Sequence, residues 1–177
     1  MNALSSGSRR GKASTTINHS QLSAPDSYRR LFGESGAALS ETEWMTTVNN
    51  SLPPNLSALN ARFESGSRSD KSLQVSYEPG QQYFSFVSLS DGAIAEMLDQ
   101  AATHCGIFVT SHVCLTLTIR VNYLRAGTGS VFIATARVLE MITSSAVVRA
   151  DLAGDRGRRI ASASVAVQLV RDTTRYA

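Results

Sequence analysis

The sequence predicts an α+β fold in which one antiparallel sheet packs around a single long helix. Three observations lead to this prediction. A mostly apolar segment with helical period spans residues 88–106, four extended segments follow it up to residue 170, and a pair of short strands with a polar turn precedes it. Because consecutive strands joined by short links usually pair antiparallel, these segments favour one sheet with the helix against one face.

Composition limits the chain to one domain. Its 177 residues are 42% hydrophobic and 18% charged, which suits a single globular core with some loosely held chain. No apolar run reaches the length of about 18 residues that a membrane span needs, and the first residues lack the apolar region of a secretory signal. The two cysteines, Cys105 and Cys114, lack the spacing of a disulfide framework or a zinc site, so we expect reduced core residues and no metal.

The net charge of +3 belongs to the first 25 residues, which hold Arg9, Arg10 and Lys12 and no acid. The rest of the chain has 14 basic and 14 acidic residues, without the basic face expected of a nucleic-acid-binding domain. The Ser-rich stretch 1–25 is predicted to be a disordered tail. An organelle transit peptide has the same bias, as do many tails without a targeting role. We therefore expect a cytoplasmic protein, or a mitochondrial or other organelle protein if the tail is a transit peptide.

Residues 26–58 are predicted to form a short helical segment in front of the main domain. A first helix is expected up to Gly33, and a second begins at Ser40, where Ser40 and Glu43 have the spacing of a capping box and Pro53 ends the helix. Three apolar residues of the second helix share one stripe: Trp44, Val48 and Leu52. This helix is expected to lie against the domain as a lid or an edge cover.

The strands are read from alternation and from turn residues. Residues 59–65 and 71–79 predict a hairpin, and residues 81–90 lead into the helix. The later strands are expected at 112–124, 130–142, 145–153 and 158–170. In the first of these, apolar residues from Val113 to Tyr123 alternate with Thr116, Thr118, Arg120 and Asn122, which predicts a long regular strand.

The helix within 88–106 has a wide apolar arc, which indicates burial: Ile94, Met97, Leu98, Ala101, Ala102 and Cys105. The small residues Gly92, Ala93 and Ala95 are expected to let strands approach its backbone. A sheet of five or six strands curled around such a helix is the hotdog arrangement, expected here over residues 59–171 with a tail at 172–177. Two acids, Glu96 and Asp99, remain to be explained.

Three segments resemble the phenylacetate-pathway type of hotdog acyl-CoA thioesterase: "SDGAIAEMLDQAA" (90–102), "LTIRVNYLRAGTGSVFIATARVLE" (117–140) and "RRIASASVAVQLV" (158–170). The resemblance covers about residues 59–170. It implies hydrolysis of the thioester between an acyl group and coenzyme A, with no cofactor beyond the coenzyme A of the substrate. It also implies a homodimer, with a dimer of dimers as the larger alternative, because the carboxylate and the amide of each site come from different protomers.

The resemblance also assigns catalytic roles. Asp99 matches the helix carboxylate that acts as general base or nucleophile. Asp91 stands where the backbone N–H points at the thioester oxygen, and Gly92 matches the second Gly of the same turn. Thr103 and Thr116 match hydroxyls that assist the base. Negative charge develops on the carbonyl oxygen during hydrolysis, and an amide at a helix N-terminus stabilises it.

Substrate-binding positions follow in the same way. Ser90 replaces a His of the family turn, and Phe84 stands where many members have an Asn that orients water. Phe84 and Phe86, with Tyr83, either roof the acyl tunnel or pack in the core. Arg125 is placed like a basic residue at the pantetheine and nucleotide end of the cleft. The turn arginines Arg156, Arg158 and Arg159 either meet the phosphates of coenzyme A or lie in solvent.

Departures from the family pattern leave a second function open. Asp91 replaces a Gly and adds a negative charge near the developing oxyanion, and the His and Asn equivalents are absent. The alternative is therefore a non-catalytic hotdog module that binds acyl-CoA or dimerises. Glu96 is expected to face solvent or a dimer partner. His104 and His112 are expected to be core or surface residues, which also disfavours a dehydratase.

Overall fold

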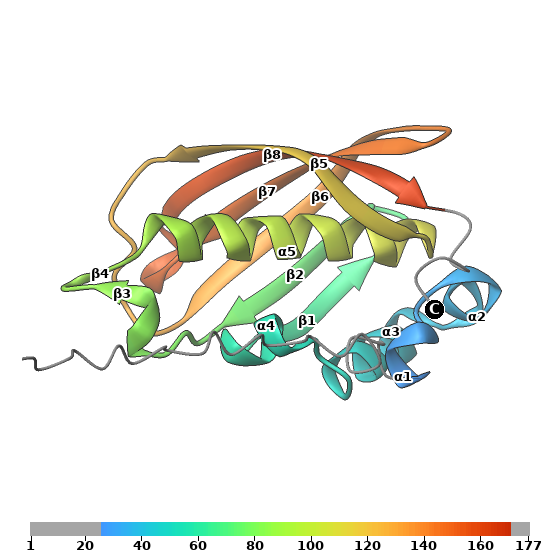
Figure 1. Cartoon of the computed structure of the whole chain (residues 1–177), viewed down its shortest axis with the longest axis horizontal. Helices are drawn as coiled ribbons and strands as arrows, with labels where there is room; N and C mark the ends of the chain where they lie inside the picture. The colour runs from blue at the N-terminus through green and yellow to red at the C-terminus, as the bar shows by residue number, and fades with distance from the viewer. Residues whose placement is uncertain (1–25, 171–177) are drawn as a thin grey trace, which may run out of the picture.

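The computed structural model describes residues 26–170, and the predictions for the tails at 1–25 and 172–177 lie outside these residues. A six-stranded antiparallel sheet curls around one 20-residue helix, and four short helices lie near one end and one edge of the sheet (Figure 1). The predicted α+β fold with one central helix is confirmed. Over the described part of the chain, no helix is long and apolar enough to cross a membrane.

The short helices come first: α1 (Asp26–Arg29), α2 (Gly33–Ala38), α3 (Glu41–Asn49) and α4 (Pro54–Ala58). The sheet holds β1 (Arg62–Ser67), β2 (Ser72–Tyr77), β5 (Val113–Tyr123), β6 (Phe132–Ile142), β7 (Ser145–Ala153) and β8 (Arg159–Val170), in the order β1-β2-β6-β7-β8-β5. Between β2 and β5 lie a 3-10 turn η2 (Gln81–Tyr83), a small hairpin of β3 (Phe84–Ser85) and β4 (Ser88–Leu89), and the central helix α5 (Asp91–Thr110). A second 3-10 turn, η3 (Asp155–Gly157), joins β7 to β8.

The position of β5 differs from the prediction that each strand pairs with the next one in the chain. β6, β7 and β8 do pair in sequence, but β5 pairs with β8 at the sheet edge, and β6 pairs with β2. The link after β5 is tied down by the amides of Leu124 and Arg125, which donate to the Ile160 carbonyl, and by the Gly127 carbonyl, which accepts from Leu89. This order covers α5 on both sides, because β5 runs back along one side while β6 joins the hairpin on the other.

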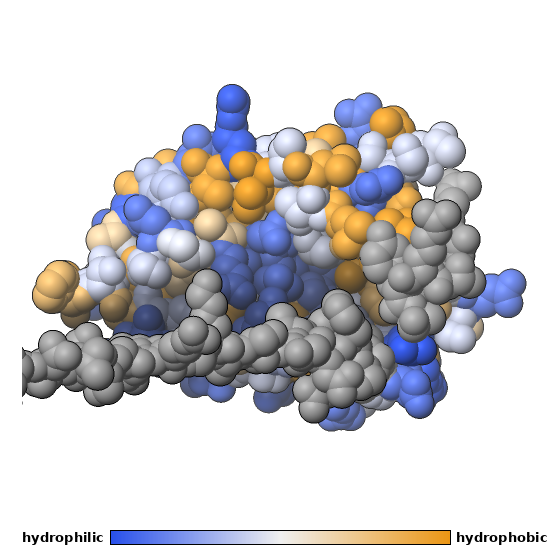
Figure 2. Space-filling view, in the orientation of Figure 1, coloured by the Kyte–Doolittle hydropathy of each residue, from blue (hydrophilic) through white to orange (hydrophobic). Residues whose placement is uncertain are grey.

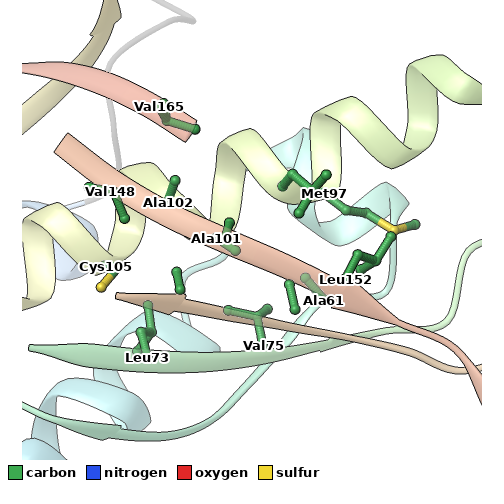
Figure 3. Packing of buried hydrophobic residues seen from close by; sticks show 14 of the residues in the cluster. Ala61, Leu73, Val75, Met97, Ala101, Ala102, Cys105, Val148, Leu152 and Val165 are labelled. Carbon is green, nitrogen blue, oxygen red and sulfur yellow. The ribbon is translucent and has the colours of Figure 1, made fainter. Parts of the chain in front are cut away.

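The core lies between α5 and the concave face of the sheet (Figure 3). All six residues of the predicted apolar arc are buried, and the Tyr77 hydroxyl donates to the Met97 carbonyl at 3.0 Å. α5 and β5 approach closely at Gly106, where an added Cβ would lie 2.8 Å from Sγ of Cys114. Gly92 has open space within 4 Å instead, so the expectation that a strand approaches the helix there is wrong.

The helix α3 covers the edge strand β1, as predicted. Its capping box is present, with Glu43 N donating to Ser40 Oγ at 3.3 Å and Ser40 N donating to the Glu43 carboxylate at 2.9 Å. Trp44 is fully buried, with edge-on ring contacts to Phe63 of β1 and Phe108 of α5. The extra helix α4, which begins at Pro54, was not predicted; a proline suits the first turn of a helix because its missing N–H has no partner there.

Candidate active site

Three of the predicted catalytic side chains meet on the side of α5 that lies next to the edge strand β5. The Thr116 hydroxyl of β5 donates to Oδ1 of Asp99 at 2.7 Å, and the Thr103 and Thr116 hydroxyls lie 3.2 Å apart. Asp99 is partly exposed, with Gly92 on the same stripe of the helix. Figure 2 shows a recessed hydrophilic area over α5, bordered by hydrophobic side chains along β5. The Asp99 carboxylate is thus held in an open groove by the Thr116 hydroxyl, which lies next to the Thr103 hydroxyl.

A β-bulge in β5 explains why Thr116 reaches the helix. Thr116 pairs with Val167 and Thr118 pairs with Ala166, so Leu117 is an extra residue between them. Such an insertion shifts the side-chain alternation by one residue. Thr116 therefore faces α5, as Ile119 does after the bulge, although strict alternation had put Thr116 and Ile119 on opposite faces. The prediction of a regular strand is wrong at this point, and the departure positions a candidate catalytic group.

The N-terminus of α5 presents free amides. Ser90 is the N-cap, and its hydroxyl accepts a hydrogen bond from Ala93 N at 3.3 Å. The first amides of a helix, here those of Asp91 and Gly92, have no acceptor within the helix and lie at its positive end. The Tyr123 hydroxyl donates to the Asp91 carbonyl at 3.1 Å and ties this turn to the end of β5. Sequence reasoning missed Tyr123, because nothing in the alternation of β5 indicates a contact with the helix start.

The carboxylate and the amides are far apart within one protomer. Asp91 and Asp99 are eight positions apart on one helix, which at about 1.5 Å of rise per residue is roughly 12 Å along its axis. A thioester carbonyl bound at the Asp91 amide is therefore out of reach of the Asp99 carboxylate of the same chain. Any reaction that uses both groups needs a second copy.

The aromatic residues before α5 have different surroundings. The Phe84 ring is partly buried, with its centroid 6.3 Å from that of Phe132. Phe86 is fully exposed at the tip of the β3–β4 hairpin, with a left-handed backbone at φ 55°. Tyr83 is partly buried, and its carbonyl accepts a hydrogen bond from Ser90 N. Within one protomer, Phe84 packs in the domain and Phe86 does not roof the groove.

The arginines near the β7–β8 turn divide between two pockets. Arg125, Arg156 and Arg158 line a pocket of about 540 Å³ with Thr128, Gly154 and Ile160. The Arg125 guanidinium donates to the Arg159 carbonyl at 2.8 Å. The Arg159 side chain instead lines a second pocket. The structure therefore places the Arg125 and Arg158 side chains at one pocket and the Arg159 side chain at another.

Other nucleophiles and bases are buried away from this groove. His104 is buried, its Nε2 lies 2.7 Å from the Tyr28 hydroxyl, and burial lowers the pKa of its imidazole to about 4. Cys105 and Cys114 are buried and unbridged, and burial raises the pKa of each thiol to about 12. Over the described residues, no cluster of side chains suits a metal ion. Asp99 is thus the candidate base that this groove exposes.

The Tyr hydroxyls near the acids are kept neutral. Burial, and then the charges of Glu96 and Asp99, raise the pKa of Tyr77 above its usual range. The pKa of Tyr123 is also raised, by desolvation and then by the Asp91 charge. Both residues therefore act as hydrogen-bond donors at neutral pH, and Tyr123 does so at the first turn of α5.

Comparison with known proteins gives one family match. Residues 88–161 match the model of the thioesterase superfamily, a segment that runs from β4 through α5 and the sheet into β8. A search of curated proteins found no match. The family match includes Asp99, Thr103 and Thr116 and the free amides of α5.

Several solved structures share the fold. A putative thioesterase, a phenylacetic acid degradation-related protein from Ralstonia eutropha JMP134, aligns with a TM-score of 0.64 and 18% identity over 67% of this chain and 91% of that one. A thioesterase family protein from Silicibacter pomeroyi aligns with a TM-score of 0.65 and 19% identity, over 72% and 95%. The PaaI protein of the E. coli phenylacetic acid degradation operon gives 0.64 and 14%, over 71% and 91%. These likenesses establish the hotdog fold, and the family match supports a thioester hydrolase.

Proposed function

From the match of residues 88–161 to the thioesterase superfamily, we propose that the protein hydrolyses acyl-CoA thioesters with Asp99 as general base or nucleophile. The observation that carries the proposal is the hydrogen-bonded set of Asp99, Thr116 and Thr103 in an open groove of α5. No cofactor takes part, because hydrolysis needs only water and a base.

The hydrogen bonds around Asp99 orient its carboxylate to act as a general base or nucleophile. Thr116 donates its proton to Oδ1, so the Thr116 oxygen is free to accept from Thr103. Oδ2 accepts no hydrogen bond from the described residues and is left to take a proton from water or to attack the carbonyl carbon. A positioned base contributes a rate gain of about a hundredfold to ten-thousandfold.

The Asp91 amide, with that of Gly92, is the proposed donor to the developing oxyanion. It combines a hydrogen bond with the positive end of the helix dipole. In other acyl-transfer enzymes the loss of one such donor costs roughly 3 to 4 kcal/mol of transition-state stabilisation. The exposed Asp91 carboxylate opposes this effect in part, because it adds negative charge close to the same oxygen.

A homodimer through β5 completes the site. β5 is an edge strand, so one side of its backbone is unpaired, and it exposes several apolar side chains: Leu115, Leu117, Ile119 and Tyr123. Antiparallel pairing of two copies about the middle of β5 brings the Tyr123 end of one copy to the Thr116 side of the other. Tyr123 is hydrogen-bonded to the Asp91 carbonyl, and Thr116 is hydrogen-bonded to the Asp99 carboxylate. Each of the two sites in such a dimer therefore combines the Asp91 amide of one chain with the Asp99 carboxylate of the other.

The pocket of Arg125 and Arg158 is the proposed site for the phosphates of coenzyme A. It lies beside the start of α5, because the link that carries Arg125 is bonded to β4 through Gly127 and Leu89. Guanidinium groups bind phosphate in paired hydrogen bonds. The buried, unbridged cysteines agree with a reducing compartment, and we propose the cytoplasm as the site of action.

A second candidate function is a non-catalytic module that binds acyl-CoA. The observation that favours it is the use of Ser90 as a helix cap and of Phe84 as a packing residue, which leaves no side chain at these two positions to orient water.

The test is hydrolysis of a panel of acyl-CoAs, followed as released thiol, by wild type, Asp99→Asn and Glu96→Gln. Asp99→Asn is expected to lower kcat at least about a hundredfold, and Glu96→Gln, one turn earlier on the same helix, is the matched control. Full activity of folded Asp99→Asn would overturn the assignment. Binding of acyl-CoA without turnover by wild type would establish the second function instead.

A further inference from the structure

A second pocket opens on the outer face of the sheet, the face opposite α5. Its volume is about 520 Å³, within the range of roughly 300 to 1,000 Å³ typical of small-molecule sites. Ile133 of β6 and Ala153 of β7 pair across its floor, and Thr135 and Asp151 form the next row. Their neighbours Phe132 and Leu152 point the other way, into the core around α5. The sheet therefore separates this pocket from the groove of Asp99.

The floor of this outer pocket is apolar. Val131 and Ile133 each leave 39% of their surface exposed there, next to the small Ala153. Polar residues border them on the same face, among them Gln74 and Thr135. A short apolar group of a ligand can cover the side chains of Val131 and Ile133. The polar residues around them limit how long that apolar group can be.

The rim of the pocket carries more positive than negative charge. Arg159 lies 3.5 Å from one carboxylate oxygen of Asp151, and Arg149 lies 3.2 Å from the other. The single carboxylate of Asp151 therefore pairs with two guanidinium groups. Arg156 lines the same rim and makes no ion pair with the described residues. A ligand that brings one anionic group supplies the charge that this rim lacks.

Two irregular features of the backbone determine where Arg159 and Arg156 lie. β7 and β8 change register between Leu152 and Ala153, and the extra residue is Ile160. The bulge lets Ile160 and Ala161 both be buried while Arg159 stays on the outer face. Arg156 has a left-handed backbone at φ 63°, which is uncommon for a residue with a side chain.

We propose that the outer pocket binds an amphipathic anion, namely a carboxylate carried on a short apolar chain. Arg159 and Arg156 hold the carboxylate, and Val131 and Ile133 cover the chain. Arg156 also lines the pocket of Arg125 and Arg158, so a ligand held by Arg156 lies next to the proposed coenzyme A site without using Asp99. This inference is independent of the proposed hydrolase activity.

The experiment is a titration of the full chain with sodium octanoate, observed through the methyl NMR signals of labelled isoleucines. The Ile133 signal, assigned with Ile133→Val, is expected to shift saturably, and the Ile119 signal on the helix side of β5 is expected to stay in place. Inorganic phosphate and methyl octanoate each lack one half of the proposed ligand and are expected to bind at least about tenfold more weakly.

Variants distinguish octanoate binding in this pocket from nonspecific electrostatic attraction of an anion to a basic protein. Arg159→Gln and Arg156→Gln are expected to weaken octanoate binding about tenfold each, and Arg120→Gln, an exposed arginine outside the pocket, is the matched control. The proposal is overturned if the Ile133 signal does not saturate, if Ile119 shifts instead, or if Arg159→Gln binds like wild type. Binding to phosphatidylglycerol vesicles without octanoate binding would also overturn it, in favour of a lipid surface.

Discussion

The Thr116 hydroxyl donates a 2.7 Å hydrogen bond to Oδ1 of Asp99, across the groove between β5 and α5. The two residues come from different elements, and a bulge in β5 is needed for them to meet. This bond fixes one oxygen of the carboxylate and leaves the other for chemistry.

Replacement of Thr116 by Val is therefore expected to lower kcat about tenfold to a hundredfold with little change in KM, because Val keeps the shape but cannot orient the base. Steady-state kinetics with the best acyl-CoA of the panel measures this effect. Thr118→Val is the matched control, because Thr118 lies on the opposite face of the same strand. Equal kcat values for both variants would remove Thr116 from the site.

The Asp91 amide can be removed without breaking the helix. Proline is favoured at the first helical position, and the preceding Ser90 already has the extended backbone that a following proline requires, at φ −68° and ψ 149°. Asp91→Pro is expected to lower kcat about a hundredfold to a thousandfold through loss of one oxyanion donor. Asp91→Asn keeps the amide and removes the charge, so it is expected to match or exceed wild type. An Asp91→Pro enzyme with wild-type kcat would show that this amide is not the donor.

The same variant tests whether the site is shared between protomers. Chains with Asp91→Pro and chains with Asp99→Asn are each expected to show the strongly reduced kcat given above when they form homodimers. In a mixed dimer, one site receives the intact amide from one chain and the intact carboxylate from the other. Coexpression and purification of mixed dimers should therefore restore activity, measured against the two parents. If mixed dimers stay inactive while each chain is folded, both groups belong to one protomer.

The edge of β5 is expected to carry the dimer contact. Leu117 is 56% exposed at the bulge, and Leu117→Lys places a charge there, a substitution that blocks pairing between edge strands. Light scattering should then show a monomer without thioesterase activity. Leu139→Lys is the control, because Leu139 is similarly exposed, at 59%, in a bulge of β6 away from that edge. A dimeric Leu117→Lys protein would exclude pairing through this part of β5.

Arg68 connects the N-terminal helices to the domain. Its guanidinium donates to the carbonyls of Phe108, Gly36 and Leu39 and lies over the Phe108 ring. Arg68→Met leaves these carbonyls without their donor and is expected to lower the free energy of unfolding by about 2 to 3 kcal/mol, measured in urea. Arg62→Met, which breaks an exposed pair with Glu64, is expected to cost less than about 1 kcal/mol. Similar losses of unfolding free energy for both variants would contradict the role of Arg68 in connecting the N-terminal helices to the domain.

Much of this fold follows from periodicity, and the rest depends on contacts that sequence does not encode locally. The apolar arc of α5 and the alternation of β6 to β8 were sufficient to predict a wrapped helix. The edge position of β5 was not predictable, because it depends on which side of α5 remains uncovered. The bulge at Leu117 was hidden since Thr116 and Thr118 have the same chemistry, so the alternation looks uninterrupted.

The candidate site was found through resemblance and not through pattern. Asp99 alone reads as a member of a polar helix face, and its contact with Thr116 joins residues that are 17 positions apart. Arg156, Arg158 and Arg159 look like one basic cluster in the sequence. Arg158 and Arg159 are consecutive residues of extended chain, so their side chains point to opposite sides and line different pockets.

The buried pair of His104 and Tyr28 predicts an acid-sensitive fold. Burial lowers the pKa of His104 from 6.5 to about 4, so the unfolded chain binds a proton more readily than the folded one between these values. The contribution of His104 to the free energy of unfolding should therefore be constant above pH 6.5. It should fall by up to about 3 kcal/mol as the pH drops towards 4. Urea unfolding of wild type and His104→Gln from pH 7.5 to 4 measures this. The variant cannot take up that proton, so the stability difference between the two proteins should narrow as the pH falls, whereas a constant difference would show that His104 does not titrate with unfolding.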